Sequence, residues 1–367
     1  MSDKKKSAYV ISSYGYIDKH INYGALLQYY ALEKTLSKLG VRTKWIRYSP
    51  KEIIWNKQSI KGIIKNIIFY GNQNKLKNVR KKFKIFLEKY CNLTDKIYTK
   101  YDELNYCNDA DLYITGSDQV WGGCAKENYL CFVPDDKRKI SYAASFGRAE
   151  ISQEQKDIIK PWLKRLDYIS VREKSGVKIC DDICIRAEWV LDPTLLIDRN
   201  EYPVNLDKTD ISGVYCYFLN ITSKEDIYWN DIIQFIETDN LLIKVACVEN
   251  TVRLFPQNYI TIDSVEGWLS NYSNSKYILT NTFHGMIFAI IFHKQFLVLK
   301  QSGLGEKQND RMVSILNLLE LEERFYDEKF PIKDQINKKI DWDKIDNILN
   351  KERQKSIDFI KKTLSDI

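Results

Sequence analysis

The chain has 367 residues, which at about 150 residues per domain is enough for two domains with separate cores. Hydrophobic residues make up 44% and charged residues 29%, with 7 Pro and 15 Gly, and this balance excludes disordered, collagen-like and low-complexity chains. The net charge of +7 is uneven, because residues 51–100 hold 13 Lys and Arg against 3 Asp and Glu, which predicts a basic face.

The first half of the chain alternates strand and helix patterns. Residues 8–12 predict a buried strand, 23–39 a helix that ends at Gly40, and 41–48 a second strand, which together make a β-α-β unit. Further elements are predicted as strands at 111–115, 139–145, 168–172 and 188–191 and as a helix at 153–166. We expect an α/β layer structure that carries a basic helical insert at about 51–100.

The second half repeats the pattern. It predicts strands at 213–219, 242–248, 259–262, 277–280 and 296–300, with helices at 227–236 and 263–272. Residues 192–208 have two prolines and no periodicity, so they are the natural linker, with a boundary near Asn200. The predicted parts are a first domain at 1–199, a second at 200–340, and an amphipathic helix at 341–367 that crosses back. The fold class is α/β, with two Rossmann-like domains facing a cleft.

The N-terminus and the cysteines indicate a cytoplasmic protein. The first 13 residues hold three Lys and an apolar run too short for a signal peptide, and no stretch approaches the ~20 apolar residues of a spanning helix. The eight Cys are then expected as reduced thiols, and the close pair Cys180 and Cys184 lacks a second ligand pair for zinc. The 24 Tyr exceed the needs of a core, which predicts rings along clefts, as carbohydrate binding would use.

The strand ends are where chemistry is expected, because ligands of parallel sheets bind beyond the carboxyl ends of the strands. After the strand at 111–115, Gly116 permits a sharp turn, and Ser117 and Asp118 are suited to cap a helix. Asp118 could also take a proton from a hydroxyl group, and a cap alone is the alternative.

His284 follows the strand at 277–280 and is one of three His in the chain. At the start of an apolar helix it could give up a proton at neutral pH, and a purely structural histidine is the alternative. Arg172 at a strand end and Arg311 at a helix start suit a bidentate grip on phosphate or carboxylate, with structural ion pairs as the alternative.

These segments make the sequence similar to the polysaccharide pyruvyltransferase family, enzymes with a GT-B-like fold that add pyruvate ketals to sugars. The stretches that carry the resemblance are Asn22-Tyr23-Gly24-Ala25 with Gln28, Gly116-Ser117-Asp118-Gln119-Val120-Trp121, Ser141-Tyr142-Ala143-Ala144-Ser145-Phe146-Gly147, Ser170-Val171-Arg172-Glu173, Val190-Leu191-Asp192-Pro193-Thr194 and Phe283-His284-Gly285. They extend in family order from residue 22 to Arg311. Some members carry Arg where this chain has Thr282, so another cation, such as Arg172, Arg311 or Lys300, would replace it.

The resemblance implies transfer of an enolpyruvyl unit from phosphoenolpyruvate to two hydroxyls of a sugar in a glycan or a lipid-linked oligosaccharide. It implies His284 as the acid or as the proton donor to the leaving phosphate, and Asp118 as the base or as a group that orients the acceptor. The donor site would use Arg172, Arg311, Thr282, Gly285, Lys300 and the amides after His284. The acceptor site would use Asn22, Tyr23, Ser117, Gln119 and Trp121. No metal or cofactor is required, because cations can neutralise the phosphate.

Two alternatives remain open. One is a GT-B glycosyltransferase that uses a nucleotide sugar. The other is a binding module built on the basic segment, although residues 51–100 contain no nucleic-acid motif, so no nucleic-acid partner is expected. Residues 53–90 place isoleucines beside lysines, as a helix resting on the anionic inner face of the plasma membrane would; packing of the isoleucines on the core is the alternative.

Overall fold

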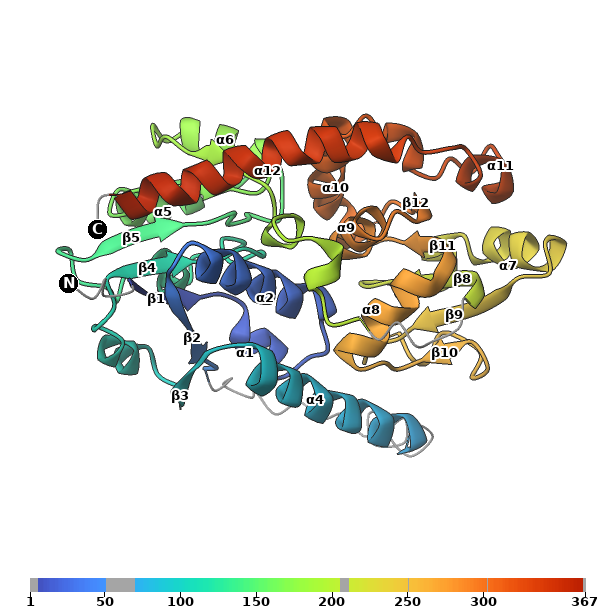
Figure 1. Cartoon of the computed structure of the whole chain (residues 1–367), viewed down its shortest axis with the longest axis horizontal. Coiled ribbons are helices and arrows are strands. Elements are labelled where there is room, and N and C mark those ends of the chain that lie inside the picture. The colour runs from blue at the N-terminus through green and yellow to red at the C-terminus, as the bar shows by residue number, and fades with distance from the viewer. Residues whose placement is uncertain (1–5, 51–69, 205–210, 250, 302, 366–367) are drawn as a thin grey trace.

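Two parallel β-sheets with the same strand order organise the chain. The computed structural model describes residues 6–50, 70–204, 211–249, 251–301 and 303–365. The first sheet has the order β3-β2-β1-β4-β5 and the second the order β10-β9-β8-β11-β12, and the pairings in both are parallel. The predicted α/β class with two Rossmann-like halves is confirmed (Figure 1).

The strands are short and mostly buried. Those of the first sheet are β1 Ser7–Ile11, β2 Arg42–Tyr48, β3 Leu93–Tyr98, β4 Leu112–Thr115 and β5 Arg138–Ser141, and those of the second are β8 Ile211–Tyr217, β9 Leu242–Ala246, β10 Ile260–Thr261, β11 Ser275–Thr280 and β12 Gln295–Val298. A two-stranded piece, β6 Ser170–Val171 and β7 Glu188–Trp189, continues beyond β5 through the Ile140–Tyr168 and Ala144–Val171 bridges. Every residue of β4 is buried, as expected of a central parallel strand covered on both faces.

The helices connect and cover these strands. In the first half they are α1 Tyr14–Ile17, α2 Tyr23–Lys38, α4 Tyr70–Tyr90, α5 Gln153–Leu163 and α6 Lys174–Asp181, and in the second half they are α7 Trp229–Thr238, α8 Val265–Asn274, α9 Phe283–Ile291, α10 Asn309–Leu318, α11 Ile332–Ile336 and α12 Trp342–Ser365.

The C-terminal helix α12 joins the two halves, as its amphipathic pattern predicts (Figure 1). At its start, His293 of the second half lies 3.1 Å from Asp346. Further along, Ser356 Oγ accepts from the amide of Leu191 at 3.0 Å, and Phe359 packs on the ring of Tyr142 in the first half.

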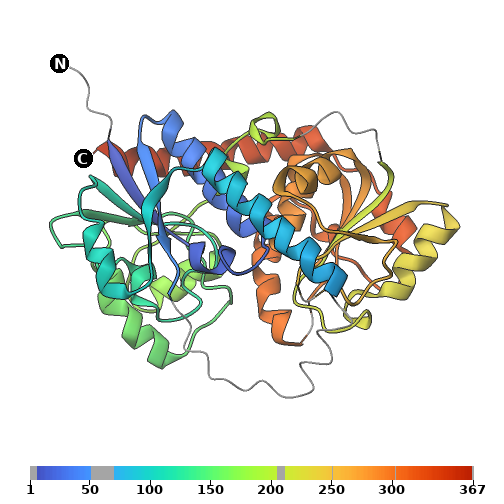
Figure 2. The ribbon, with the colours of Figure 1, turned by 90° about the horizontal axis from the view of Figure 1, so that it is seen from below.

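Helix α4 crosses the same joint on the other side of the molecule (Figures 1 and 2). Arg80 pairs with Glu249 of the second half at 2.9 Å, and Phe83 packs on Tyr23 of the first half. Most of the apolar side of α4 is buried on the core, although Ile85 is exposed. Lys81, Lys82 and Lys84 remain exposed, and residues 53–69, with Ile60, Ile63, Ile64, Ile67, Ile68, Lys57, Lys61 and Lys65, lie outside the described residues.

Three local predictions are corrected by the structure. No helix begins at Ser117 or Asp118; Asp118 instead has a left-handed φ of 86° and bridges to Ala144. Strand β5 ends at Ser141, because the chain turns through Ala143 at a φ of 52°. The last part of the predicted helical insert at about 51–100 is instead strand β3, which has no continuous apolar pattern because three of its six residues are exposed at the sheet edge.

The order of the strands reverses between β1 and β4 in the first sheet and between β8 and β11 in the second. Loops that leave such neighbouring strands in opposite directions open a crevice at their carboxyl ends. The repeat therefore provides two crevices, and the candidate site lies where they face each other.

Candidate active site

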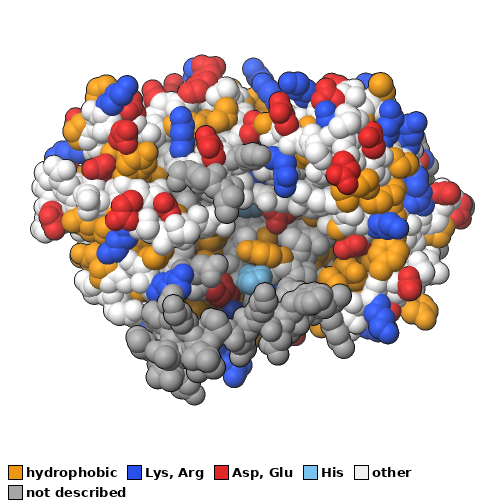
Figure 3. All heavy atoms as spheres, turned by 180° about the vertical axis from the view of Figure 1, so that it is seen from behind, with side chains coloured by type: hydrophobic (Ala, Val, Ile, Leu, Met, Phe, Trp, Pro, Cys, Tyr) orange, Lys and Arg blue, Asp and Glu red, His pale blue; other side chains and the backbone are white. Residues whose placement is uncertain are grey.

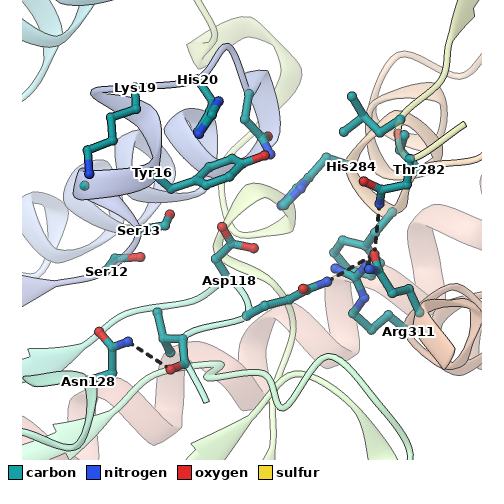
Figure 4. Close-up of a pocket in the computed structure, with 18 of the residues that line it drawn as sticks. Ser12, Ser13, Tyr16, Lys19, His20, Asp118, Asn128, Thr282, His284 and Arg311 are labelled. Atoms are coloured by element: carbon teal, nitrogen blue, oxygen red, sulfur yellow. Dashed lines mark hydrogen bonds between the residues drawn. The ribbon is translucent and has the colours of Figure 1, made fainter. Parts of the chain in front are cut away.

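A cavity of about 610 Å3 lies between the two halves. It is lined by residues that follow all four central strands, among them Ser13 after β1, Asp118 after β4, Asn220 after β8 and His284 after β11. Figure 3 shows the hollow from outside, with a histidine side chain in it, and Figure 4 shows the lining residues. The crevices of the two sheets therefore join to form this one cavity.

His284 is held at the second position of α9. Thr282 caps this helix, because its hydroxyl accepts from the amide of Gly285 at 2.9 Å, while the carbonyl of Thr282 accepts from Met286. These bonds occupy the two amides after His284, whereas those of Phe283 and His284 have no acceptor among the described residues. The positive end of the helix is thus open to an anion at the cavity.

The ring of His284 lies against Gly24 of α2. A Cβ at residue 24 would be 2.1 Å from Nδ1 and 2.2 Å from Cγ of His284. Only glycine allows this approach, so Gly24 of the first half forms the surface on which the His284 ring of the second half rests; we call this surface the seat of His284.

Asp192, in the linker, holds the residues behind His284 together. Its fully buried carboxylate accepts from Arg172 Nη1 at 2.7 Å, from Ser117 Oγ at 2.9 Å and from Thr194 Oγ1 at 2.6 Å. The Nε2 atom of His284 lies 3.6 Å from the same carboxylate. Burial disfavours the charge, but His284, Arg172 and Thr194 outweigh it and hold the pKa of Asp192 well below its usual value.

Asp118 faces the cavity from the first half. Its left-handed backbone is stabilised by bonds from the amides of Val120 and Ser145 to its carbonyl, at 2.8 and 3.0 Å. Its carboxylate stays 17% exposed and lies 4.0 Å from Arg172 Nη2. A strained residue of this kind at a cavity is typical of functional sites.

Two buried arginines lie near the ring of Phe283, at 4.5 Å for Arg172 and 5.6 Å for Arg311. Arg172 is fully enclosed by Asp192 and Glu173, and although burial opposes its charge, these carboxylates raise its pKa above the usual value. Arg172 is not among the residues that line the cavity.

Arg311 lines the cavity and has no carboxylate within 4.0 Å among the described residues. Neutral groups surround it: Gln308 Oε1 accepts from Nη2 at 3.0 Å, and the amide of Gln119, with its oxygen toward Arg311, accepts at 2.7 and 2.9 Å. Burial and the charge of Arg172 lower the pKa of Arg311 to about 10. Glu173, Asp118 and Asp192 act on this charge from a distance, but none of them pairs with it. A buried cation without a direct ionic partner is costly, so this end of the cavity is suited to an anion.

Unpartnered polar groups gather at the cavity. Among the described residues, 13 buried side-chain polar atoms lack a hydrogen-bond partner, and five of them belong to the cavity lining, in Ser13, Tyr217, His284, Gln301 and Arg311. Buried polar groups are normally paired, so a concentration of unpaired ones indicates where a polar ligand binds.

The structure brings six of the residues predicted from the sequence together in this cavity: Asn22, Asp118, Gln119, Thr282, His284 and Arg311. Ser117 and Gly285 lie directly behind it. Trp121 is buried against Tyr129, and Tyr23 is stacked on Trp268 at 4.9 Å, where it joins the halves. Lys300 is exposed and its Nζ lies over the ring of Phe325.

Two residues that matter to the arguments below, Asp192 and Tyr16, were not among the predicted site residues. Asp192 lies within a stretch that carries the family resemblance, and its buried contacts with Arg172 and Ser117 are long-range, so only the fold reveals them. Tyr16 lies in the short helix α1, for which the sequence has no apolar period. In the described part of the chain no three His, Cys, Asp or Glu side chains cluster as a metal site, and no helix has the length and hydropathy to span a bilayer.

The chain was compared with known protein families, curated sequences and solved structures. The family model for polysaccharide pyruvyl transferase matches residues 22–303. No curated protein sequence matches the chain.

Three solved structures of similar fold span nearly the whole chain. A putative UDP-N-acetylglucosamine 2-epimerase from Listeria monocytogenes is 10% identical over 88% of this chain and 89% of that one, with a TM-score of 0.50. A UDP co-structure of MnaA from S. aureus is 11% identical over 95% of both chains, also at 0.50. The glycotransferase of kitacinnamycin is 9% identical over 98% of both, again at 0.50. At these identities the likeness establishes the GT-B-like fold alone.

Proposed function

The chain belongs to the polysaccharide pyruvyl transferase family, and we propose that it transfers a pyruvyl group from phosphoenolpyruvate to two hydroxyls of a glycan sugar, forming a ketal and releasing phosphate. The observation that supports this reaction best is the unpaired Arg311 in a cavity that also holds His284 and Asp118. An anionic donor supplies the missing counter-charge, and the other two side chains can move protons.

The donor would bind between Arg311 and the start of α9. Phosphoenolpyruvate carries a carboxylate and a phosphate, and the site offers a guanidinium fork and the open amides of Phe283 and His284. Arg311 would take the place of the cation that some family members have at residue 282. The route uses no cofactor beyond the donor, because these groups neutralise the phosphate.

The proposed reaction balances with two proton transfers to the donor. His284 protonates the methylene carbon, so that the adjacent carbon becomes electrophilic and bonds to the first sugar oxygen, whose proton passes to Asp118. The second hydroxyl displaces the phosphate, the C–O bond to phosphate breaks, and the second proton leaves with the phosphate group. The proton held by Asp118 then passes to solvent and His284 takes one up from solvent, so that both groups regain their starting states. One ketal and one phosphate result.

Asp192 would orient the acid. Its carboxylate lies 3.6 Å from Nε2 of His284 and is fixed by Arg172, Ser117 and Thr194. A fixed carboxylate beside Nε2, together with Gly24 packed against Nδ1, holds the ring in one orientation, and Nε2, which has no hydrogen-bond partner among the described residues, is the nitrogen that would exchange a proton with the substrate. Arg172 then acts through Asp192, which revises its expected role as a direct donor ligand.

Calorimetric titration with phosphoenolpyruvate tests the donor site. Arg311→Met keeps the packing on Phe283 and removes the charge, so donor binding should fall at least tenfold while the melting temperature stays at or above that of the wild type. Arg199→Met, at an exposed arginine of the linker, is the control and should bind like the wild type. Lys300→Met reports whether the exposed lysine contributes.

Turnover is tested with a panel of lipid-linked and synthetic glycans. Phosphate release with a mass gain of one pyruvate ketal supports the proposal. Binding of UDP-sugars in place of phosphoenolpyruvate, with glycosyl transfer, would assign the cavity to a glycosyltransferase instead.

A further inference from the structure

Tyr16 presents an exposed aromatic ring to the candidate active site. Seven large hydrophobic side chains are exposed among the described residues, and Tyr16, at 52% exposure, is the one of them that lines the cavity. Most described tyrosines are buried in the core, so this exposure is not a property of tyrosines in the chain generally. An exposed ring inside a concave polar site indicates a ligand with an apolar face.

The backbone around Tyr16 holds the ring in a fixed place. In helix α1, Tyr14 and Ile17 are buried, and the ring of Tyr14 packs edge-on against Trp45 at 5.7 Å. A Cβ at Gly15 would be 2.8 Å from the carbonyl oxygen of Tyr48, so the helix is docked closely on the end of β2. Because the buried pair is three residues apart, Tyr16 between them is turned to the cavity.

The two faces of the Tyr16 ring differ in their surroundings. The ring of His20 lies on one side, with the centroids 4.8 Å apart and the planes tilted by 36°. Figure 4 shows Asp118 on the opposite side and His284 further along the cavity. The space beside the ring on the Asp118 side therefore has an apolar wall and a carboxylate near it.

We propose that Tyr16 is the stacking platform of an acceptor subsite that takes a pyranose ring. The ring C–H bonds of the sugar lie on Tyr16, and its hydroxyls point from the edge of the sugar toward Asp118. The sugar carries two hydroxyls near enough to close a five- or six-membered ketal, either on adjacent carbons or two carbons apart. The stacking stands on the geometry of Tyr16, while the identification of the ligand as acceptor rests on the proposed function.

Saturation-transfer NMR with methyl α- and β-pyranosides of glucose, galactose and mannose tests the subsite directly. The wild type should transfer magnetisation to the ring C–H protons of at least one of them. Tyr16→Phe keeps the ring and should retain this transfer, whereas Tyr16→Leu should lose most of it. Tyr106→Leu is the matched control, because Tyr106 is 73% exposed and lies outside the cavity.

Kinetics with a glycan acceptor give a second measurement. Tyr16→Leu should raise the acceptor KM at least tenfold and change kcat less, with phosphoenolpyruvate affinity unchanged. Wild-type behaviour of Tyr16→Leu, an equal loss in Tyr106→Leu, or no transfer to any pyranoside in the wild type would overturn the subsite. If pyranosides bind through Tyr16 but phosphoenolpyruvate does not bind, the proposed function fails and the subsite stands; the reverse result leaves the function and removes the subsite.

Discussion

Replacing Gly24 by alanine tests whether the seat of His284 is essential to the site. The added Cβ would lie 2.1 Å from Nδ1, 2.2 Å from Cγ and 2.5 Å from Cβ of His284. Because contacts of a Cβ below about 3.0 Å essentially do not occur, the ring or helix α9 has to move by about 1 Å. The contact with the Cβ of His284 means that rotation of the ring alone cannot relieve the clash.

The substitution is expected to lower activity strongly while the protein stays folded. Overpacking of this kind costs roughly 1–3 kcal/mol, which a chain of this size tolerates. A displacement of about 1 Å in a catalytic group reduces the rate by about 100-fold. The assay is phosphate release from phosphoenolpyruvate with an acceptor glycan, with the free energy of unfolding measured in urea.

Gly123→Ala is the matched control, because a Cβ there meets nothing within 4 Å. NMR of the histidine rings adds a direct measurement, since the chain has three His and the His284 signal is identified by its absence in His284→Gln. A folded Gly24→Ala protein with activity within threefold of the wild type and an unshifted His284 signal would refute the reasoning.

Three further predictions concern carboxylates. Asp192→Asn places an amide opposite Arg172 and leaves that buried cation short of a partner, so the free energy of unfolding in urea should fall by about 3–5 kcal/mol, whereas the exposed Asp198→Asn should stay near the wild type. Asp118→Asn keeps a residue type that tolerates a φ of 86° and removes the charge, so kcat should fall about 100-fold at an unchanged melting temperature; wild-type turnover would remove Asp118 from the chemistry. Burial raises the pKa of Glu33 from 4.5 to about 7, so the folded state holds this proton more tightly than the unfolded state, and unfolding free energy should fall by roughly 3 kcal/mol as the pH rises through that window. Urea unfolding curves measured between pH 4.5 and 7 should show this fall of the unfolding free energy with pH in the wild type and a smaller fall in Glu33→Gln.

Sequence patterns reveal most of the fold because both sheets are parallel and buried. Strands such as β4 and the end of β11 are continuous apolar runs, and turn residues separate them from the helices. The edge strand β3 is less distinct, since its exposed residues break the run. The excess of tyrosine is explained only in part by the cleft, which Tyr16, Tyr48 and Tyr217 line. Rings such as Tyr29, Tyr142 and Tyr215 instead fill the core and satisfy their hydroxyls there.

The site is predictable only in part, for a physical reason. His284, Asp118 and Arg311 stand at strand ends or helix starts, positions that the pattern of elements identifies. Whether an arginine there is free for a ligand depends on its neighbours in space. Arg172 and Arg311 look alike in sequence, yet carboxylates enclose the first and neutral amides surround the second.

The absence of a direct ionic partner at Arg311, in the part of the chain that the structure describes, connects ligand binding with the arrangement of the two halves. His284 belongs to the second half, but its ring rests on Gly24 of the first and faces Asp192 of the linker, so the acid is in place only when the halves meet as they do here. That meeting also buries Arg311 against Gln119 of the first half without a counter-charge. Burying an unpaired cation costs free energy, and a bound anion offsets it. An anionic donor at Arg311 would therefore stabilise the arrangement that holds His284 in position, so that the acid is assembled when the donor is bound.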